Sequence, residues 1–222
     1  MKNLLFVLGL TFFQLAGFSE ALPEIKEETV DFLKSRLNSD RIEHFFGSYG
    51  VDALEINSHV FPLSRIANLH SVHQGKKIMR TLAIVDFFQP TPIYLSPVHQ
   101  EIIEGKSIGI ALREQGFTLH KNHVYFGTVS LSPELMDWMD EHFMDQASLH
   151  IYRLEVSRDD KSEPVPYCTI LEVHSPQYLT EKWLQALYED QYKKFSVKSK
   201  ETELLLDRLS ILIQDFPLQE RH

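Results

Sequence analysis

Cysteine is almost absent from this sequence of 222 residues, because Cys168 stands alone and no disulfide can form within the chain. A hydrophobic core must therefore hold the fold in place of crosslinks. A single cysteine inside the run PYCTI is usually a small buried apolar residue, and the alternative is a catalytic thiol. Repeats, low-complexity tracts and long Pro/Gly/Ser linkers are also missing, so we expect residues 22–222 to form a single domain.

Positive charge is scarce as well. Lysine and arginine total 22 against 31 aspartates and glutamates, which gives a net charge of −9, and the basic clusters are confined to GKK and KKFSVKSK. Binding to a phosphate backbone needs a positive surface, so nucleic acid is not an expected partner. Apolar runs long enough to approach a membrane span occur only near the N-terminus, and we expect no stable membrane insertion beyond that segment.

The N-terminal run MKNLLFVLGLTFFQLAGFSEA predicts a secretory signal peptide. It contains one lysine, an apolar stretch from Leu4 to Phe18, and the small residues Ser19 and Ala21 at an A-x-A-like cleavage site. We expect residues 1–21 to be removed and the protein to be periplasmic or secreted. The alternatives are a buried first helix or, if cleavage fails, a membrane anchor, but the apolar part is short for a span of about 20 residues.

Periodicity along the rest of the chain predicts an α+β domain with an antiparallel sheet and flanking helices. Apolar residues at helical spacing predict helices over residues 24–37, 96–105, 106–116, 132–144, 176–194 and 200–216. Runs rich in β-branched and aromatic residues predict a central strand over 77–88, a hairpin formed by 148–156 and 166–174, and another hairpin within 117–129 that turns at Lys121-Asn122. Gly47 and Gly50 indicate a tight turn or a close backbone approach, and Ser132 is the expected helix cap before Pro133. Helices before, between and after antiparallel strands indicate the α+β class.

Charged residues inside the predicted strands are the strongest candidates for a site. Arg80 lies in the strand 77–88, on the expected face of Leu82 and Ile84, while Glu172 and His174 share one face of the strand 166–174. Buried charges persist only when they are paired or hydrogen-bonded. Either Arg80 and Glu172 pair with each other across the sheet, which would be structural, or they line a pocket and bind a polar molecule.

Other catalytic chemistries find little support in the sequence. There are 11 histidines, and the pairs His70/His73 and His120/His123 have three-residue spacing, but neither pair has a third metal ligand nearby. The HExxH pattern of zinc proteases and the G-x-S-x-G pattern of serine hydrolases are absent. We therefore expect no metal and no cofactor.

Three short segments between Lys77 and about Pro176 are informative when they are taken in order. They are a strand with an early arginine (MRTLAIVDF), the segment EGKSIGIAL, and the alternating run TILEVHSP with its glutamate and closing proline. This order resembles the chorismate lyase-like family. The resemblance implies an antiparallel sheet whose flanking helices enclose a ligand cavity. The chain departs from the family pattern at SIG, where a version with proline is usual, and at His174, which adds an ionisable group.

The resemblance also implies roles for individual residues. Arg80 would correspond to the arginine that binds the carboxylate of an aromatic acid, and Glu172 to the acid that meets the ring hydroxyl or ether oxygen. The backbone at Ile108 and Gly109 would correspond to the segment that closes the pocket. His174 has no counterpart in the family pattern, and our own expectation is that it binds with the acid and tunes it. The expected function is an exported protein that binds an aromatic or cyclic carboxylate; if it is an enzyme, it would be a cofactor-independent carbon–oxygen lyase of the chorismate pyruvate-lyase type. The alternative is a non-catalytic secreted protein that meets a protein partner through its acidic surface and C-terminal helices.

Overall fold

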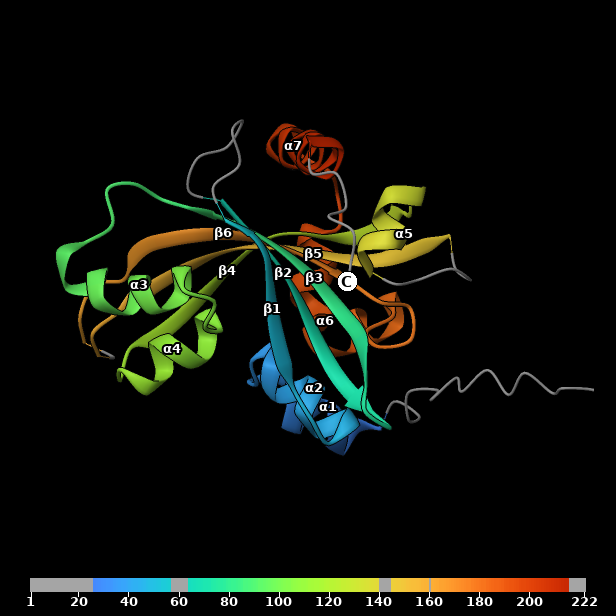
Figure 1. Cartoon of the computed structure of the whole chain (residues 1–222), viewed down its shortest axis with the longest axis horizontal. Coiled ribbons are helices and arrows are strands. Elements are labelled where there is room, and N and C mark those ends of the chain that lie inside the picture. Colours follow the sequence, from blue (N-terminus) through green and yellow to red (C-terminus); the bar gives the residue numbers. More distant parts are fainter. Residues whose placement is uncertain (1–25, 57–63, 140–144, 160, 216–222) are drawn as a thin grey trace, which may run out of the picture.

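The computed structural model describes residues 26–56, 64–139, 145–159 and 161–215. Across these residues the fold is α+β, with seven α-helices and one six-stranded antiparallel sheet (Figure 1). Within the same residues, no helix combines the length and apolar character needed to span a bilayer. The predicted signal peptide, residues 1–21, lies outside the described residues.

Helices and strands alternate in groups along the chain. The helices are α1 (Glu27–Lys34), α2 (Asn38–Phe46), α3 (Ser96–Ile103), α4 (Ile108–Glu114), α5 (Pro133–Met139), α6 (Glu181–Phe195) and α7 (Lys200–Asp215), with a short 3-10 helix η1 (Ile93–Leu95) before α3. The strands are β1 (Gly50–Ile56), β2 (Ser64–His73), β3 (Lys76–Phe87), β4 (Thr118–Ser130), β5 (Gln146–Ser157) and β6 (Val165–His174).

The sheet consists of two three-stranded meanders. Its spatial order is β1-β2-β3-β6-β5-β4, so β1–β3 form one half, β4–β6 form the other, and the halves meet only where β3 pairs with β6. Between β2 and β3, Gln74 and Gly75 both have positive φ, 49° and 78°. Two such residues in a row suit a two-residue hairpin turn whose twist matches that of the strands.

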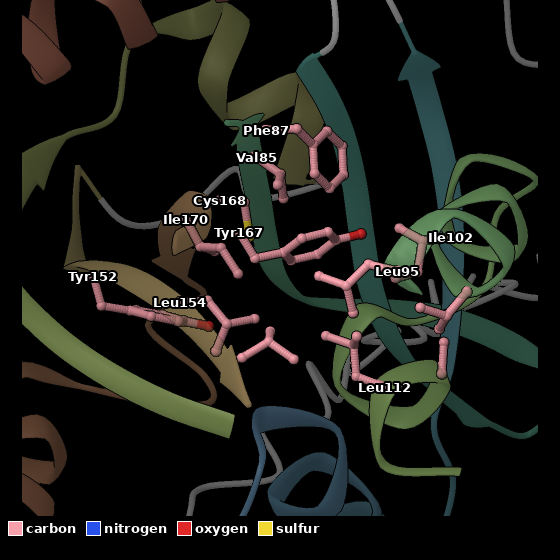
Figure 2. Close-up of a cluster of buried hydrophobic side chains, with 13 residues drawn as sticks. Val85, Phe87, Leu95, Ile102, Leu112, Tyr152, Leu154, Tyr167, Cys168 and Ile170 are labelled. Carbon is pink, nitrogen blue, oxygen red and sulfur yellow. The ribbon is translucent and has the colours of Figure 1, made fainter. Parts of the chain in front are cut away.

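The two faces of the sheet carry different layers, which Figure 1 shows with α7 and the α1–α2 pair on opposite sides. Helices α5 and α7 cover one face, where the buried cluster is apolar throughout. The other face carries two clusters: α1, α2 and α6 pack over one part, and η1, α3 and α4 pack over the rest. Figure 2 shows the latter, with Val85, Leu154, Tyr167 and Ile170 pointing from the sheet toward Leu95, Ile102 and Leu112.

Cys168 belongs to this cluster of Figure 2 and is fully buried, as the sequence predicts. Burial raises the pKa of its thiol well above the ordinary value, which keeps the group protonated at neutral pH. The residue therefore behaves as a small apolar side chain.

Several predicted elements are confirmed. The hairpin of β5 and β6, the central strand β3, and the helices α3, α4, α6 and α7 lie where the periodicity places them. Ser132 caps α5 by accepting the Leu135 N–H at 3.3 Å, and Gly47 ends α2 with φ +71°. The predicted helix over 24–37 is shorter, because α1 ends at Lys34 and a separate helix begins at Asn38.

The predicted hairpin turn at Lys121-Asn122 is wrong. β4 runs without a turn from Thr118 to Ser130 and pairs with β5 along its whole length. A β-bulge between His123 and Tyr125 shifts the register there. The extra residue of a bulge breaks the alternation of inward and outward side chains, and that break resembles a turn in the sequence.

The predicted face of Arg80 is also wrong. Opposite β2, strand β3 has one extra residue at this point, and the resulting bulge removes Arg80 from the face of Leu82 and Ile84. Its Nε donates to the Ser71 hydroxyl at 2.9 Å, and its guanidinium carbon lies 3.4 Å from the centre of the Phe46 ring in α2. Arg80 is therefore buried on the opposite face of the sheet from the one expected.

Candidate functional site

A cavity of about 70 Å³ lies on the face of the sheet covered by α1–α4. It lies where the packing of α3 and α4 ends and the packing of α1 and α2 begins, since residues from both groups line it. Most of its wall is apolar, including Ala67, Val85, Leu154 and Ile170. The volume is several times the roughly 10–15 Å³ that one water needs, so a compact molecule can be held there.

Small side chains in the middle of the sheet create this space. Ala67 of β2 lies opposite Ala83 of β3, and Ala83 lies opposite Glu172 of β6. Each alanine ends at its Cβ, so the row across the sheet leaves a hollow above it that larger residues would fill. Glu172 stands at the end of this row with its side chain at the hollow.

Glu172 is buried, with 6 % of its surface exposed, and its hydrogen-bond donors are neutral. One carboxylate oxygen, Oε1, accepts from Asn38 Nδ2 and from the Tyr152 hydroxyl, both at 3.3 Å. The other oxygen, Oε2, lies 3.8 Å from His150 Nδ1 and from His174 Nε2. Among the described residues, no lysine or arginine forms an ion pair with this carboxylate.

The two histidines beside Glu172 are uncharged at neutral pH. Burial lowers the pKa of His174 to about 3, although the nearby Glu172 acts in the opposite direction. Burial also lowers the pKa of His150 well below its ordinary value. Each ring has a polar partner on its far side: His174 Nδ1 lies 2.9 Å from Thr81 Oγ1, and His150 Nε2 lies 2.9 Å from His123 Nδ1. The direct neighbours of Glu172 are therefore neutral dipoles, and the charge of Arg41 acts on the carboxylate without forming an ion pair with it.

Asn38, the first residue of α2, fixes the position of the helix over this site. Its Nδ2 donates to Thr81 Oγ1 at 3.1 Å as well as to Glu172, and its Oδ1 accepts from the Tyr178 hydroxyl at 2.7 Å. Both ends of the amide are thus satisfied, as a buried amide requires. The network joins α2 to β3, to β6 and to the segment before α6.

Arg65 of β2 is a second buried charge on the cavity wall, with 2 % of its surface exposed. Its Nη1 donates to the carbonyl oxygen of Lys106 at 2.7 Å, and its Nη2 donates to that of Gly105 at 3.0 Å. Its Nε is buried without a hydrogen-bond partner, and no carboxylate of the described residues pairs with the guanidinium. Burial lowers the pKa of Arg65, while Tyr49 and Tyr167 act in the opposite direction. A buried cation without an anion is costly unless a further partner arrives.

The predicted site residues divide into two groups. Glu172, Ile108 and Gly109 line the cavity, and the last two do so from the start of α4. Arg80 and His174 are buried nearby on the same face but are not part of the lining. Neither a hydrogen bond nor an ion pair joins Glu172 to Arg80, so the structural alternative, a direct salt bridge between the two, does not form.

Sequence reasoning missed Arg65. The signal was present in the run SRIANL, where Arg65 is a charged residue next to apolar ones, as Arg80 and Glu172 are in their strands. Lys121 of β4 was also not recognised as part of the site; it lines the cavity, and its Nζ lies 4.7 Å from the centre of the Tyr152 ring. Within the described part of the chain, no three His, Cys, Asp or Glu side chains gather where they could hold a metal.

Comparisons with known proteins give a weak structural likeness. No protein-family model matches this chain, and no curated protein matches it in sequence. Among solved structures, the chain is similar to the C-terminal domain of YurK from Bacillus subtilis, with 17 % sequence identity and a TM-score of 0.33. That match covers 57 % of this chain and 88 % of the other. A likeness this slight assigns neither a family nor an activity.

Proposed function

We propose that this protein binds a small aromatic or cyclic carboxylate in the cavity between Arg65 and Glu172, within a chorismate lyase-like fold. One observation carries the proposal: two buried side chains of opposite charge border the same cavity, and each lacks a charged partner among the described residues. A bound molecule with a carboxylate at one end and a hydroxyl at the other would satisfy both, because the carboxylate accepts from Arg65 and the hydroxyl donates to Glu172.

Arg65 supplies the anion-binding end. A guanidinium donates through a planar set of N–H groups and binds carboxylates in the same plane. The Nη1 and Nη2 bonds to the loop between α3 and α4 hold the group in place, and the buried Nε–H remains for a ligand oxygen. A carboxylate at Arg65 would neutralise a charge that is otherwise buried alone.

Glu172 supplies the other end. Its two hydrogen bonds are both 3.3 Å long, so the carboxylate can take a further donor such as a ring hydroxyl. The alanines and the branched apolar residues between the two charges offer a flat, apolar wall for a ring. The modest volume favours a single ring over a larger ligand.

The arginine in this proposal differs from the one that the sequence resemblance indicates. The resemblance assigns carboxylate binding to Arg80, but that side chain packs on Phe46 outside the cavity lining. Arg65 lies on the adjacent strand and does line the cavity, so we assign the role to it. If the protein is an enzyme, Glu172 in its acid form would donate a proton to the ether oxygen as the bond from that oxygen to the ring carbon breaks, without metal or cofactor. The enolpyruvate leaves and tautomerises to pyruvate, and the ring loses a proton, which returns to the Glu172 carboxylate, to become aromatic.

Thermal unfolding with a ligand panel tests the proposal. The panel contains chorismate, 3- and 4-hydroxybenzoate and benzoate, with benzamide as the neutral control. A ligand present at 100 times its Kd adds about 2.7 kcal/mol to the free energy of unfolding, so an acid of the panel should raise Tm clearly while benzamide does not. Absence of any shift at saturating concentrations would favour the alternative of a non-catalytic interaction protein.

Three variants locate the binding site. Glu172→Gln and Arg65→Lys should each remove the ligand-induced rise in Tm. Glu172→Gln removes the charged acceptor, and Arg65→Lys removes the planar set of N–H donors of the guanidinium. Arg80→Lys is the matched control: it keeps a buried cation in the neighbouring strand and should leave the shift in place. A shift lost in Arg80→Lys and kept in Arg65→Lys would return the role to Arg80.

Release of pyruvate separates binding from catalysis. Chorismate is incubated with the protein, and pyruvate is detected through NADH oxidation by lactate dehydrogenase. Turnover that disappears in Glu172→Gln would establish a lyase, whereas a Tm shift without pyruvate would establish a binding protein.

We also propose that the protein is exported to the periplasm or beyond, on the strength of the predicted signal peptide. N-terminal sequencing of the protein from cells that secrete it should give Leu22 as the first residue. Retention of Met1 in the cell-associated protein would contradict export.

A further inference from the structure

A second hollow lies beside the cavity and is rich in positive charge. It is a cleft of about 450 Å³ on the side of α1, α2, α4 and β4. Its charged lining residues are Lys34, Arg36, Arg41, Arg113, Lys121 and a single acid, Asp40. The whole chain has a net charge of −9, so this positively charged cleft is opposite in sign to the molecule as a whole.

Most of these cations form no ion pair with a described residue, although the charge of Arg36 also acts on Asp40 and that of Arg41 on Glu172. Arg113 binds Asp40 at 2.7 Å, and this is the cleft's one ion pair between described residues. Arg41 is buried and donates from Nη1 to the Tyr188 hydroxyl and from Nε to the Leu33 carbonyl, which are both neutral. Lys34 and Arg36 are exposed and form no ion pair with a described residue. Clefts lined by one sign of charge concentrate ions of the other sign.

The cleft and the cavity share a wall. Leu37, Leu119 and Lys121 line both spaces, and each of these side chains is half-buried. On the cavity side, the Lys121 ammonium lies over the ring of Tyr152, whose hydroxyl donates to Glu172. The side chains of this wall are long and unbranched at Cβ, so they can change rotamer without moving the backbone.

We propose that the cleft is the entrance to the cavity, that its positive charge draws in small anions, and that Leu37, Leu119 and Lys121 form the gate between the two spaces. The identity of the anion as a carboxylate rests on the proposed function, but the route does not. The charge acts on the rate of entry, because steering speeds association and weakens with ionic strength.

Thiol accessibility tests the route without any ligand. Ala67 lines the cavity and not the cleft, so Ala67→Cys in a Cys168→Ala background places a single reporter thiol behind the gate. The probes are two methanethiosulfonates of similar size, one with a sulfonate and one with a trimethylammonium group. Each forms a mixed disulfide with the thiolate and releases methanesulfinate, and each rate is divided by its rate with 2-mercaptoethanol. Ala83→Cys is the second reporter if the first variant does not fold.

The sulfonate probe should react faster than the cationic probe at low ionic strength. Lys34→Glu with Arg36→Glu should lower the ratio of the two rates by about tenfold, and the effect should vanish near 1 M salt, where the Debye length is about 3 Å. The control is Lys182→Glu with Lys198→Glu, an equal change of charge at exposed residues outside both spaces, which should leave the ratio nearly unchanged. Leu119→Trp should slow both probes alike, because it narrows the gate.

Several outcomes would overturn the entrance. They are a rate ratio that ignores the reversal at Lys34 and Arg36, a control variant that lowers the ratio equally, or a reporter in a folded protein that neither probe reaches. Failure of the ligand panel with a positive thiol result would reject the proposed ligand and keep the route. A ligand-induced Tm shift together with a negative thiol result would support the proposed ligand and reject the entry route.

Discussion

The two faces of the central strands are filled in opposite ways. Toward α5 and α7, strands β3, β5 and β6 present a continuous apolar surface made of Leu82, Ile84, Leu149, Ile151, Leu171 and Val173. Toward α1–α4 and α6, the same strands present Thr81, Ala83, Ser148, His150, Glu172 and His174. Because the backbone is shared, the difference lies in the side chains alone.

This contrast separates stability from chemistry within one sheet. Buried polar groups contribute little net stability even when they are hydrogen-bonded, and a hollow loses packing contacts. The apolar face contains neither buried polar groups nor a hollow, so its packing compensates for the stability that the other face lacks. Substitutions on the two faces should therefore have different consequences, and the contrast can be measured.

The largest effect is expected on the apolar face. Leu149 is fully buried, so Leu149→Ala removes apolar contacts and leaves a void, which should lower the free energy of unfolding by about 2–5 kcal/mol. Urea unfolding followed by circular dichroism measures the change. Leu204→Ala, at an exposed position of α7, is the control and should change it by less than about 0.5 kcal/mol. Equal losses in the two variants would mean that this face is not the main source of stability.

The next effect is a dependence of stability on pH that arises on the polar face. The pKa of His174 is about 3 in the folded protein and near 6.5 when the chain is unfolded, so between these values the unfolded state binds more protons. Stability should therefore rise with pH through this window and fall on acidification, by up to about 1.4 kcal/mol per pH unit for such a histidine.

His174→Asn isolates this contribution. The variant should show a shallower dependence on pH between about 4 and 6.5 than the original protein, whatever its stability at pH 7. Urea unfolding at a series of pH values gives the slopes. Identical slopes would show that the His174 ring is protonated in the fold and not held neutral.

A smaller effect is expected for the acid itself. Glu172→Gln keeps the shape and replaces a carboxylate whose partners are neutral, so the free energy of unfolding should change by no more than about 1 kcal/mol. The ligand-induced rise in Tm should nevertheless be lost. A decrease beyond about 3 kcal/mol, the size found when a buried ion pair is broken, would make Glu172 a structural residue.

The smallest effect is expected outside both faces. Lys193 and Glu189 form an exposed pair at 3.5 Å on α6, four residues apart. Lys193→Ala should lower stability by less than about 0.5 kcal/mol, and less still in high salt. A change comparable to that of Glu172→Gln would remove the distinction between surface and site.

Most of the helices and three of the strands could be predicted because long runs carry a clear period. Strands β1 and β2 were not predicted, and two β-bulges account for the errors at Arg80 and in β4. At Arg80 and between His123 and Tyr125, one extra residue reverses which side chains point to each face of the sheet. The sequence of one strand alone does not reveal this, because a bulge is defined by the register with the partner strand. This error placed Arg80 on the wrong face and produced a hairpin turn within β4.

The candidate site was predictable only in part for a related reason. Glu172 stands out locally as an acid in an apolar run. Arg65 becomes significant only through distant neighbours, because the carbonyls that hold it belong to Gly105 and Lys106, about forty residues along the chain. The hollow itself depends on Ala67 meeting Ala83 across two strands, and no local pattern encodes that meeting.

The cavity spans the pairing of β3 with β6, so a ligand bound in it can affect how firmly the two halves of the sheet are held together. Arg65 and Ala83 belong to the first meander, Tyr152 and Glu172 belong to the second, and the halves share a single strand pairing. A ligand that binds Arg65 and Glu172 at the same time would link the two halves of the sheet and oppose their separation. Amide protons of β3 and β6 should then exchange more slowly once the ligand is bound, while those of the outer strands β1 and β4 keep their rates.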